Sequence, residues 1–273
     1  MNKKKTPSRA KTKGPVNQSK GQAKQSASSK KQETKIQSSG KNQGGSPAQG
    51  KRNLKVKVKS ARGRKISSTM WLQRQLNDPY VKRAKEEGLR ARAAFKLIEI
   101  DDQFDLIKSG MVIVDLGAAP GGWSQVAARR AKSEEGKGQV VAIDISEMEP
   151  IPGVEIIHMD FMEDEAPDEL KKALKGNAAD IVMSDMAAPS TGHKQTDHLR
   201  IIGLAEAALE FAIEVLKPEG TFLAKVLQGG TEHELLALMK KYFKKTRHVK
   251  PDASRADSSE LYVMATGFKG REN

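Results

Sequence analysis

Two lysines and two acids stand at positions where a folded protein rarely keeps a charge that it does not use. Lys225 interrupts an otherwise apolar run, and Lys96 interrupts the apolar face of a helical segment. A buried charge is costly unless it is paired or its pKa is usefully shifted. Asp185 ends one apolar run and Glu260 directly precedes another. We expect the four side chains to converge at one rim and act on a proton there, although a single lysine beside a strand often extends its charged end into solvent.

A glycine-rich segment follows the first apolar run and reads Asp115-Leu116-Gly117-Ala118-Ala119-Pro120-Gly121-Gly122-Trp123. Glycines at this place allow close approach of a ligand and a tight entry into a helix. The spacing departs from the dinucleotide pattern GxGxxG, and proline lacks the N–H that a pyrophosphate cradle uses. The segment therefore favours an adenosine cofactor without phosphates, S-adenosylmethionine, although such a turn can also be purely structural.

Acids at later strand ends strengthen the cofactor interpretation. Asp144 ends the second apolar run, where a carboxylate would accept both ribose hydroxyls of an adenosine. Asp160 would receive the adenine amino group, and Asp185 would lie beside the methyl donor. A lone aspartate after a strand is more often a helix cap or a turn residue. Three such residues, together with the glycine loop, favour a binding site.

The elements that must position these groups alternate between strand and helix patterns. Helical spacing is found near 79–88, 91–103 and 121–132, and in a long segment that Pro218 and Gly220 are expected to end; a capping box at 231–234 begins another helix. Apolar runs typical of buried strands lie at 111–116, 140–145, 154–158, 181–184, 221–226 and 261–266. This alternation predicts an α/β fold with a mostly parallel, doubly wound sheet that helices cover on both faces. Ligands of such sheets bind beyond the carboxyl ends of the strands.

The charge of the 273-residue chain is divided unevenly. Its net charge is +14, but residues 1–65 hold 20 Lys or Arg against one acid and no aromatic residue. Residues 66–273 hold 28 basic and 33 acidic groups. We expect a disordered, lysine-rich tail over 1–65 that attracts nucleic acid, followed by one folded domain over 66–273. A transit peptide would favour arginine and an amphipathic helix, which this tail lacks.

Several other chemistries are disfavoured by the sequence. The absence of cysteine excludes disulfides, thiolate zinc sites and a cysteine nucleophile. Segment 45–51 resembles a P-loop, but Arg52 stands where Ser or Thr is required. His193, Asp197 and His198 lack helical ligand spacing and are expected to form a loop and helix cap, so no metal is predicted. No apolar run reaches the roughly 18 residues that cross a bilayer, and we expect a cytoplasmic protein without membrane contact.

From residue 67 to 269, the chain resembles the FtsJ (RrmJ/RlmE) family of ribosomal RNA ribose 2′-O-methyltransferases. The segments that carry the resemblance are Trp71-Leu72, Gly88-Leu89-Arg90-Ala91-Arg92, Phe95-Lys96-Leu97, Asp115 to Trp123, Met183-Ser184-Asp185-Met186-Ala187, Lys225-Val226 and Lys250-Pro251-Asp252-Ala253-Ser254-Arg255. The resemblance implies a Rossmann-like, S-adenosylmethionine-dependent fold. It assigns a catalytic tetrad to Lys96, Asp185, Lys225 and Glu260, and cofactor contacts to Gly121, Trp123, Asp144, Asp160 and Asp185. Segment 188–192 departs from the family pattern, which affects the expected shape of the substrate loop.

The family implies methyl transfer to the ribose 2′-oxygen of a uridine in large-subunit (23S) ribosomal RNA, presented in a ribosomal particle. A free hydroxyl is a weak nucleophile, and Lys225 is the candidate that takes or polarises its proton. Burial and Lys96 would lower the pKa of Lys225, whereas Asp185 and Glu260 would raise it. If the carboxylates dominate, Lys225 is a charged group that orients the hydroxyl.

Basic groups cluster at 82–96 and 240–255, while 134–185 is acidic. Such basic blocks either contact RNA phosphates or are solvated helix faces. The main rival hypothesis is a catalytically silent RNA-binding or assembly factor with the same fold. A nicotinamide-dependent dehydrogenase is disfavoured by the missing GxGxxG. We expect a monomer.

Overall fold

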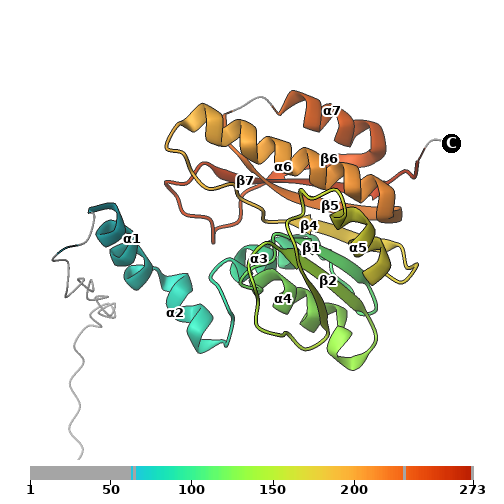
Figure 1. Cartoon of the computed structure of the whole chain (residues 1–273), viewed down its shortest axis with the longest axis horizontal. Coiled ribbons are helices and arrows are strands. Elements are labelled where there is room, and N and C mark those ends of the chain that lie inside the picture. The colour runs from blue at the N-terminus through green and yellow to red at the C-terminus, as the bar shows by residue number, and fades with distance from the viewer. Residues whose placement is uncertain (1–62, 64–65, 230–231, 272–273) are drawn as a thin grey trace, which may run out of the picture. The chain divides into compact units, whose positions relative to one another are not determined.

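One seven-stranded sheet organises the part of the chain that the computed structural model describes, residues 63, 66–229 and 232–271 (Figure 1). These residues lie within one of the two units of the chain, Asn53–Asn273. The strands are β1 (Val112–Leu116), β2 (Gln139–Asp144), β3 (Val154–His158), β4 (Ala179–Ser184), β5 (Leu216–Leu227), β6 (Phe243–Val249) and β7 (Glu260–Phe268). The helices are α1 (Ile66–Asn77), α2 (Pro79–Glu86), α3 (Ala94–Phe104), α4 (Gly122–Ala131), the short η1 (Ser133–Glu135), α5 (Ala166–Ala173), α6 (Lys194–Val215) and α7 (His233–Tyr242).

The sheet has the order β3-β2-β1-β4-β5-β7-β6. Neighbouring strands among the first five are parallel, whereas β7 is antiparallel to both β5 and β6. Helix α4 connects β1 to β2, α5 connects β3 to β4, and α6 connects β4 to β5. The prediction of a mostly parallel, doubly wound α/β sheet is confirmed.

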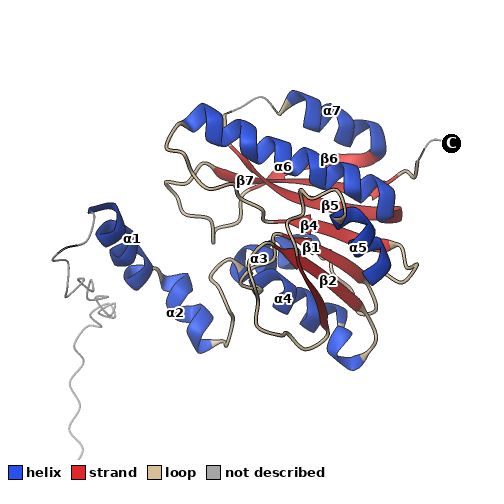
Figure 2. Ribbon diagram, viewed as in Figure 1, coloured by secondary structure: helices blue, strands red, loops and turns tan. Residues whose placement is uncertain are grey.

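Alternate residues of the central strands feed two separate core layers, as the two-residue period of a strand requires. Val114 and Leu116 of β1 pack in the layer that holds α5, α6 and α7. Ile113 packs in the opposite layer with α3 and α4. Figure 2 shows the strands running between these helices. Because both faces are covered, ligands have access to the sheet only along its edges and strand ends.

The local signals at two helix ends gave different outcomes. Asp78 caps α2 as expected, since its side chain accepts a hydrogen bond from the Tyr80 backbone N–H at 3.0 Å and Pro79 opens the helix. Helix α6, however, ends at Val215, before Pro218 and Gly220. Those two residues instead lie in the first part of β5, where its pairing with β4 shifts register. The helix thus ends within a few residues of the expected position, and the two stop residues belong to the bulged strand that follows directly.

Helix α1, the short η1, helix α5 and strand β6 were not predicted. In β6, the two end residues are buried and those between are partly or fully exposed, with lysines and an arginine prominent. An edge strand of this kind lacks the apolar run used to find the others. The proposed cap residue Thr231 lies outside the described residues, and Glu232 occupies the cap position of α7. The expected tail and its P-loop-like segment also fall outside the described residues.

Asp115 in β1 is a fully buried acid at the start of the glycine loop. Its Oδ2 accepts a hydrogen bond from Ser124 Oγ at 2.6 Å, while Oδ1 has no partner within the described structure. Burial raises the pKa of Asp115 to about 7, and the charges of Asp185 and Asp144 add to this rise. Removal of an ionised carboxylate from water is the dominant cause.

The raised pKa predicts how stability varies with pH. Between about pH 4 and 7 the folded state binds more protons at Asp115 than the unfolded chain, so this group stabilises the fold most below pH 4 and its contribution is lost as pH rises through 7. The variant Asp115→Asn should flatten the pH dependence of the free energy of unfolding, measured by urea denaturation from pH 5 to 8. Asp164→Asn, at an exposed site, serves as the control. Parallel profiles for Asp115→Asn and the parent chain would contradict the assignment.

Candidate active site

The four predicted charged side chains meet at one end of the sheet. Asp185 directly follows β4, Lys225 lies near the end of β5, Glu260 opens the antiparallel β7, and Lys96 projects from α3. Lys96 Nζ lies 2.7 Å from Glu260 Oε1 and 3.9 Å from Asp185 Oδ2. Lys225 Nζ lies 3.2 Å from Asp185 Oδ1 and also donates to the Asp185 backbone carbonyl. The convergence predicted from the sequence is present, with charges alternating in sign.

All four side chains of this cluster are largely withdrawn from water. Their exposed fractions are 11% for Lys96, 9% for Lys225, 17% for Asp185 and 18% for Glu260. Two positive and two negative groups in such a place compensate one another, whereas a lone one would carry a large desolvation penalty. The small exposed remainder allows a substrate group to reach the charged atoms.

Tyr262 is a central member of this cluster that the sequence reasoning missed. Its hydroxyl donates to Asp185 Oδ1 at 2.8 Å and lies 3.4 Å from Glu260 Oε1, and its ring centroid lies 5.7 Å from Lys96 Nζ. Burial raises the pKa of Tyr262 well above its ordinary value, and the two carboxylates raise it further. It therefore remains a hydrogen-bond donor.

A sequence signal for Tyr262 existed. It stands two residues after Glu260 in a strand, so the two side chains share one face. It is also the cross-strand partner of Lys225 in the pairing of β5 with β7. An uncharged tyrosine is ordinary in a strand, however, so its residue type alone does not mark it as part of a site.

A cavity of about 680 Å³ adjoins Asp185 at the carboxyl ends of β1, β2 and β4. Its lining includes the predicted cofactor residues Asp144 and Asp160. Ile145 and Met162, which also line it, are 65% and 55% exposed. Apolar side chains left open on a cavity wall suit a flat aromatic ring, and both follow closely after the predicted acids. The remaining lining residues are Gly117, Ala119, Ile143, Ser146, Phe161, Met186, Ala187, Ala188, Pro189, Arg200, Gly203 and Leu204.

The glycine loop has few backbone N–H groups left for a phosphate. The N–H groups of Gly117 and Ala118 donate to the Ile143 carbonyl, and that of Gly121 donates to the Ala118 carbonyl. The Ala119 N–H donates to Asp144 Oδ2 at 2.9 Å, and Pro120 has no N–H. Residues 117–121 therefore leave no free backbone N–H for a pyrophosphate. This donor set agrees with a phosphate-free adenosine cofactor, and Asp144 holds the loop as well as lining the cavity.

Gly117 permits close contact between this loop and the segment after β4. Its φ is +74°, and a Cβ here would lie 2.4 Å from Met186 Cγ and 2.9 Å from Met186 Cα. No side chain fits without moving the backbone. The glycine thus brings the cavity loop against the residue that follows Asp185.

Gly121 and Trp123 are not among the residues that line the cavity. The Trp123 indole is 3% exposed; it donates to the Ala93 carbonyl at 2.8 Å and packs 5.5 Å from Tyr262. Gly121 has a φ of +102°, and a Cβ there would lie 2.5 Å from Ile151 Cδ1. The structure gives these two residues packing roles beside the cavity, and their direct contact with a cofactor stays a prediction.

Segment 188–192, which departs from the family pattern, is held by Asp197 at the start of α6. The Asp197 carboxylate accepts hydrogen bonds from the hydroxyls of Ser190 and Thr191 and from the Thr191 backbone N–H, all within 2.7 Å. These bonds lower the pKa of Asp197. The expected loop is present, held by the first turn of α6; His193 occupies the cap position without a side-chain capping bond, and Asp197 and His198 lie within the helix. No set of three or more His, Asp or Glu side chains in the described ranges is placed to hold a metal ion.

The basic blocks at 82–96 and 240–255 differ in how many of their positive side chains are paired with acids. In the first, Lys82 and Arg83 pair with acids one turn away, and Arg92 pairs with Asp78. In the second, Lys245 on β6 is exposed without a carboxylate partner in the described residues. Ion pairs on solvent-exposed helix faces therefore account for part of the first block.

No helix in the described ranges is long and apolar enough to cross a bilayer.

Comparison with known proteins agrees with the geometry. The family described as FtsJ-like methyltransferase matches residues 89–268. Ribosomal RNA large subunit methyltransferase E of Xanthobacter autotrophicus is 66% identical over 219 residues, covering 80% of this chain and 86% of that protein. The protein of the same name from Paramagnetospirillum magneticum is 60% identical over 235 residues, covering 85% and 96%. A crystal structure of a putative ribosomal RNA methyltransferase from Plasmodium falciparum is 31% identical, with a TM-score of 0.60, and covers 67% of this chain and 100% of that one.

The charged cluster predicts strong coupling between Lys96 and Glu260. Lys96→Met or Glu260→Gln alone leaves an uncompensated group and should destabilise the fold by about 3 kcal/mol. The double variant should cost less than the sum, with a coupling energy of about 1–3 kcal/mol in urea unfolding. The matched cycle at the exposed pair Lys175 and Glu155, whose Nζ and Oε2 lie 2.8 Å apart, should give about 1 kcal/mol or less. Additive effects at Lys96 and Glu260 would show that the cluster is not an energetic unit.

Proposed function

The chain belongs to the FtsJ-like methyltransferase family, and from that premise we propose that it transfers a methyl group from S-adenosylmethionine to the 2′-oxygen of a uridine in 23S ribosomal RNA. The substrate is the large ribosomal subunit or its precursor. The observation that carries this proposal is a set of four charged side chains of alternating sign. They lie beside a cavity that suits an adenosine cofactor without phosphates. We further propose that the protein acts as a monomer in the cytoplasm.

The cavity supplies groups for the adenosine part of S-adenosylmethionine. Asp144 would accept hydrogen bonds from the ribose hydroxyls, and Asp160 from the adenine amino group, while Ile145 and Met162 would cover the ring. Asp185 lies on the cavity wall and also in the charged cluster. When bound, S-adenosylmethionine supplies an electrophilic methyl group on a sulfonium sulfur. Asp185 therefore joins the cofactor side of the site to the side where the substrate hydroxyl reacts.

Lys225 is the group that acts on the 2′-hydroxyl proton. Its Nζ is fixed by two contacts with Asp185, one to Oδ1 and one to the backbone carbonyl. Tyr262 donates to the same Oδ1 atom, and Lys96 lies 3.9 Å from the other carboxylate oxygen, Oδ2. A neutral Lys225 would accept the hydroxyl proton, whereas a charged one would donate to the hydroxyl oxygen and stabilise its developing negative charge. The two roles differ in their pH–rate profiles, and both require the amine at this place.

The proposed role of Lys225 predicts a selective loss of catalysis. Lys225→Ala should lower kcat by about 10²-fold or more, because general acid–base groups contribute on that order. The dissociation constant for S-adenosylmethionine should hardly change, since Lys225 does not line the cavity. Single-turnover transfer of labelled methyl to undermethylated large subunits measures the first effect, and calorimetry the second. The exposed Lys175→Ala is the control, and a Lys225→Ala enzyme that retains most of its rate would remove Lys225 from the chemistry.

The same assay separates the rival hypotheses. Transfer of label to the large subunit by the parent chain supports the enzyme. Binding of S-adenosylmethionine without transfer favours a silent assembly factor, and binding of neither cofactor nor subunit contradicts both. The basic tail carries all of the excess positive charge of the chain, since acidic groups outnumber basic ones in residues 66–273. We propose that it supplies salt-sensitive affinity for ribosomal RNA, while residues near the site position the substrate.

A further inference from the structure

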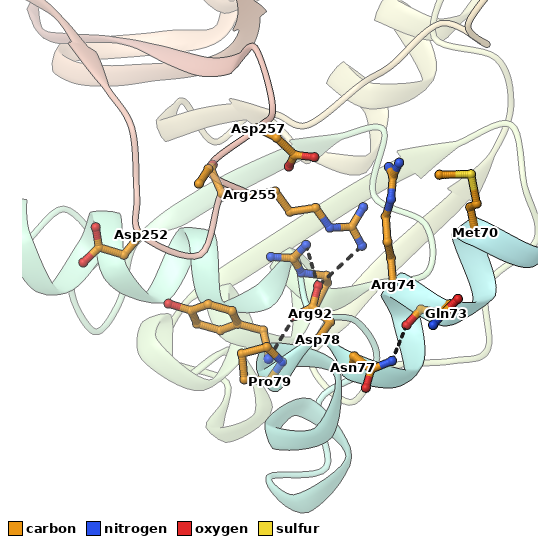
Figure 3. A pocket seen from close by; sticks show the side chains of 13 residues that line it. Met70, Gln73, Arg74, Asn77, Asp78, Pro79, Arg92, Asp252, Arg255 and Asp257 are labelled. Atoms are coloured by element: carbon orange, nitrogen blue, oxygen red, sulfur yellow. Dashed lines mark hydrogen bonds and ion pairs between the residues drawn. The ribbon is translucent and has the colours of Figure 1, made fainter. Parts of the chain in front are cut away.

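A second pocket, separate from the cofactor cavity, lies beside the charged cluster. It has a volume of about 590 Å³ and lies between α1, the start of α2 and the loop at 252–257 (Figure 3). That volume is within the range of small-molecule sites. None of its lining residues is shared with the cofactor cavity. The cofactor therefore does not account for it.

Ser254 connects this pocket to the reacting end of the site. Its side chain lines the pocket, and its Oγ donates to Glu260 Oε1 at 3.1 Å. Glu260 in turn pairs with Lys96. If the target ribose is held at the charged cluster, the neighbouring nucleotide of the same RNA strand therefore lies close to this pocket.

Two guanidinium groups in the pocket are available to a ligand. Arg74 on α1 is exposed and has no ion pair among the described residues. Arg255 approaches Asp78 only at 3.4 Å, while Arg92 holds the same carboxylate at 2.9 Å. Figure 3 shows Arg74 and Arg255 extending toward the same space from opposite walls. The Asp78 carboxylate stays paired if Arg255 takes another partner.

The charges of the pocket fit one nucleotide better than a run of phosphates. A planar guanidinium binds a phosphate through two parallel hydrogen bonds, and two of them facing each other favour a single phosphodiester. Asp252 and Asp257 also line the pocket and are exposed. They would repel further phosphates, but a carboxylate accepts hydrogen bonds from the amino or imino groups of a base.

We propose that this pocket is the subsite for the nucleotide next to the methylated one, with Arg74 and Arg255 binding its phosphate. The inference rests on the proposed function, because it takes the charged cluster as the place of the target ribose. The two arginines are positioning residues: they hold the RNA strand in register and do not touch the reacting atoms.

The full-length double variant Arg74→Gln/Arg255→Gln tests this subsite. The KM for undermethylated large subunits should rise about tenfold, while kcat at saturating substrate stays unchanged, because the lost contacts are charge-assisted hydrogen bonds to a bound phosphate. The salt dependence of binding to a short oligouridylate should fall by about 0.7 in slope for one lost phosphate contact. Arg74→Lys/Arg255→Lys should retain that slope.

The matched control is Arg129→Gln, an exposed arginine at the far end of α4. Unchanged KM and salt slope in the double variant would overturn the subsite, as would an equal rise in KM for Arg129→Gln. A fall in kcat with unchanged KM would place the arginines in the fold or the chemistry and also overturn it. The oligouridylate measurement needs no turnover, so a failure of methyl transfer by the parent chain is distinguished from a failure of the subsite.

Discussion

The compensation of two buried lysines by two half-buried carboxylates is the interaction on which the rest of the site depends. Lys96, Lys225, Asp185 and Glu260 come from one helix and three strand ends that are distant in the sequence. No one of them is stable there alone, because each would be a poorly solvated charge. Their contacts thus require α3, β4, β5 and β7 to be in register, and Tyr262 joins both acids with one hydroxyl. The four charges together form a polarised corner at this end of the sheet, where a hydroxyl can be activated.

The sheet topology places this corner beside the cofactor cavity. Strands β1 and β4 are adjacent and parallel, so the glycine loop and Asp185 emerge at the same edge. Gly117 lets the loop pack against Met186 without a side chain between them. The antiparallel β7 brings Glu260 and Tyr262 to that edge from the opposite chain direction. Methyl donor and hydroxyl are therefore expected to meet at Asp185.

Groups with a strong local signal were predictable from the sequence. The tetrad and the acids at 144 and 160 were predicted because a charge within or next to an apolar pattern is conspicuous. Tyr262, Ile145 and Met162 were missed because their types are ordinary in strands and loops, and only pairing or cavity geometry reveals them. The edge strand β6 was missed because lysines interrupt its pattern. Trp123 carried a family signal, yet its indole is used to pack α3 against Tyr262.

The position of the transferred methyl group tests the central claim most directly. Undermethylated large subunits are incubated with the protein and S-adenosylmethionine labelled in the methyl group, and the RNA is then digested to nucleosides. In the proposed mechanism the charged cluster acts on a ribose hydroxyl, so the label should be recovered in 2′-O-methyluridine. Label recovered on a base nitrogen or carbon would contradict this account of the site.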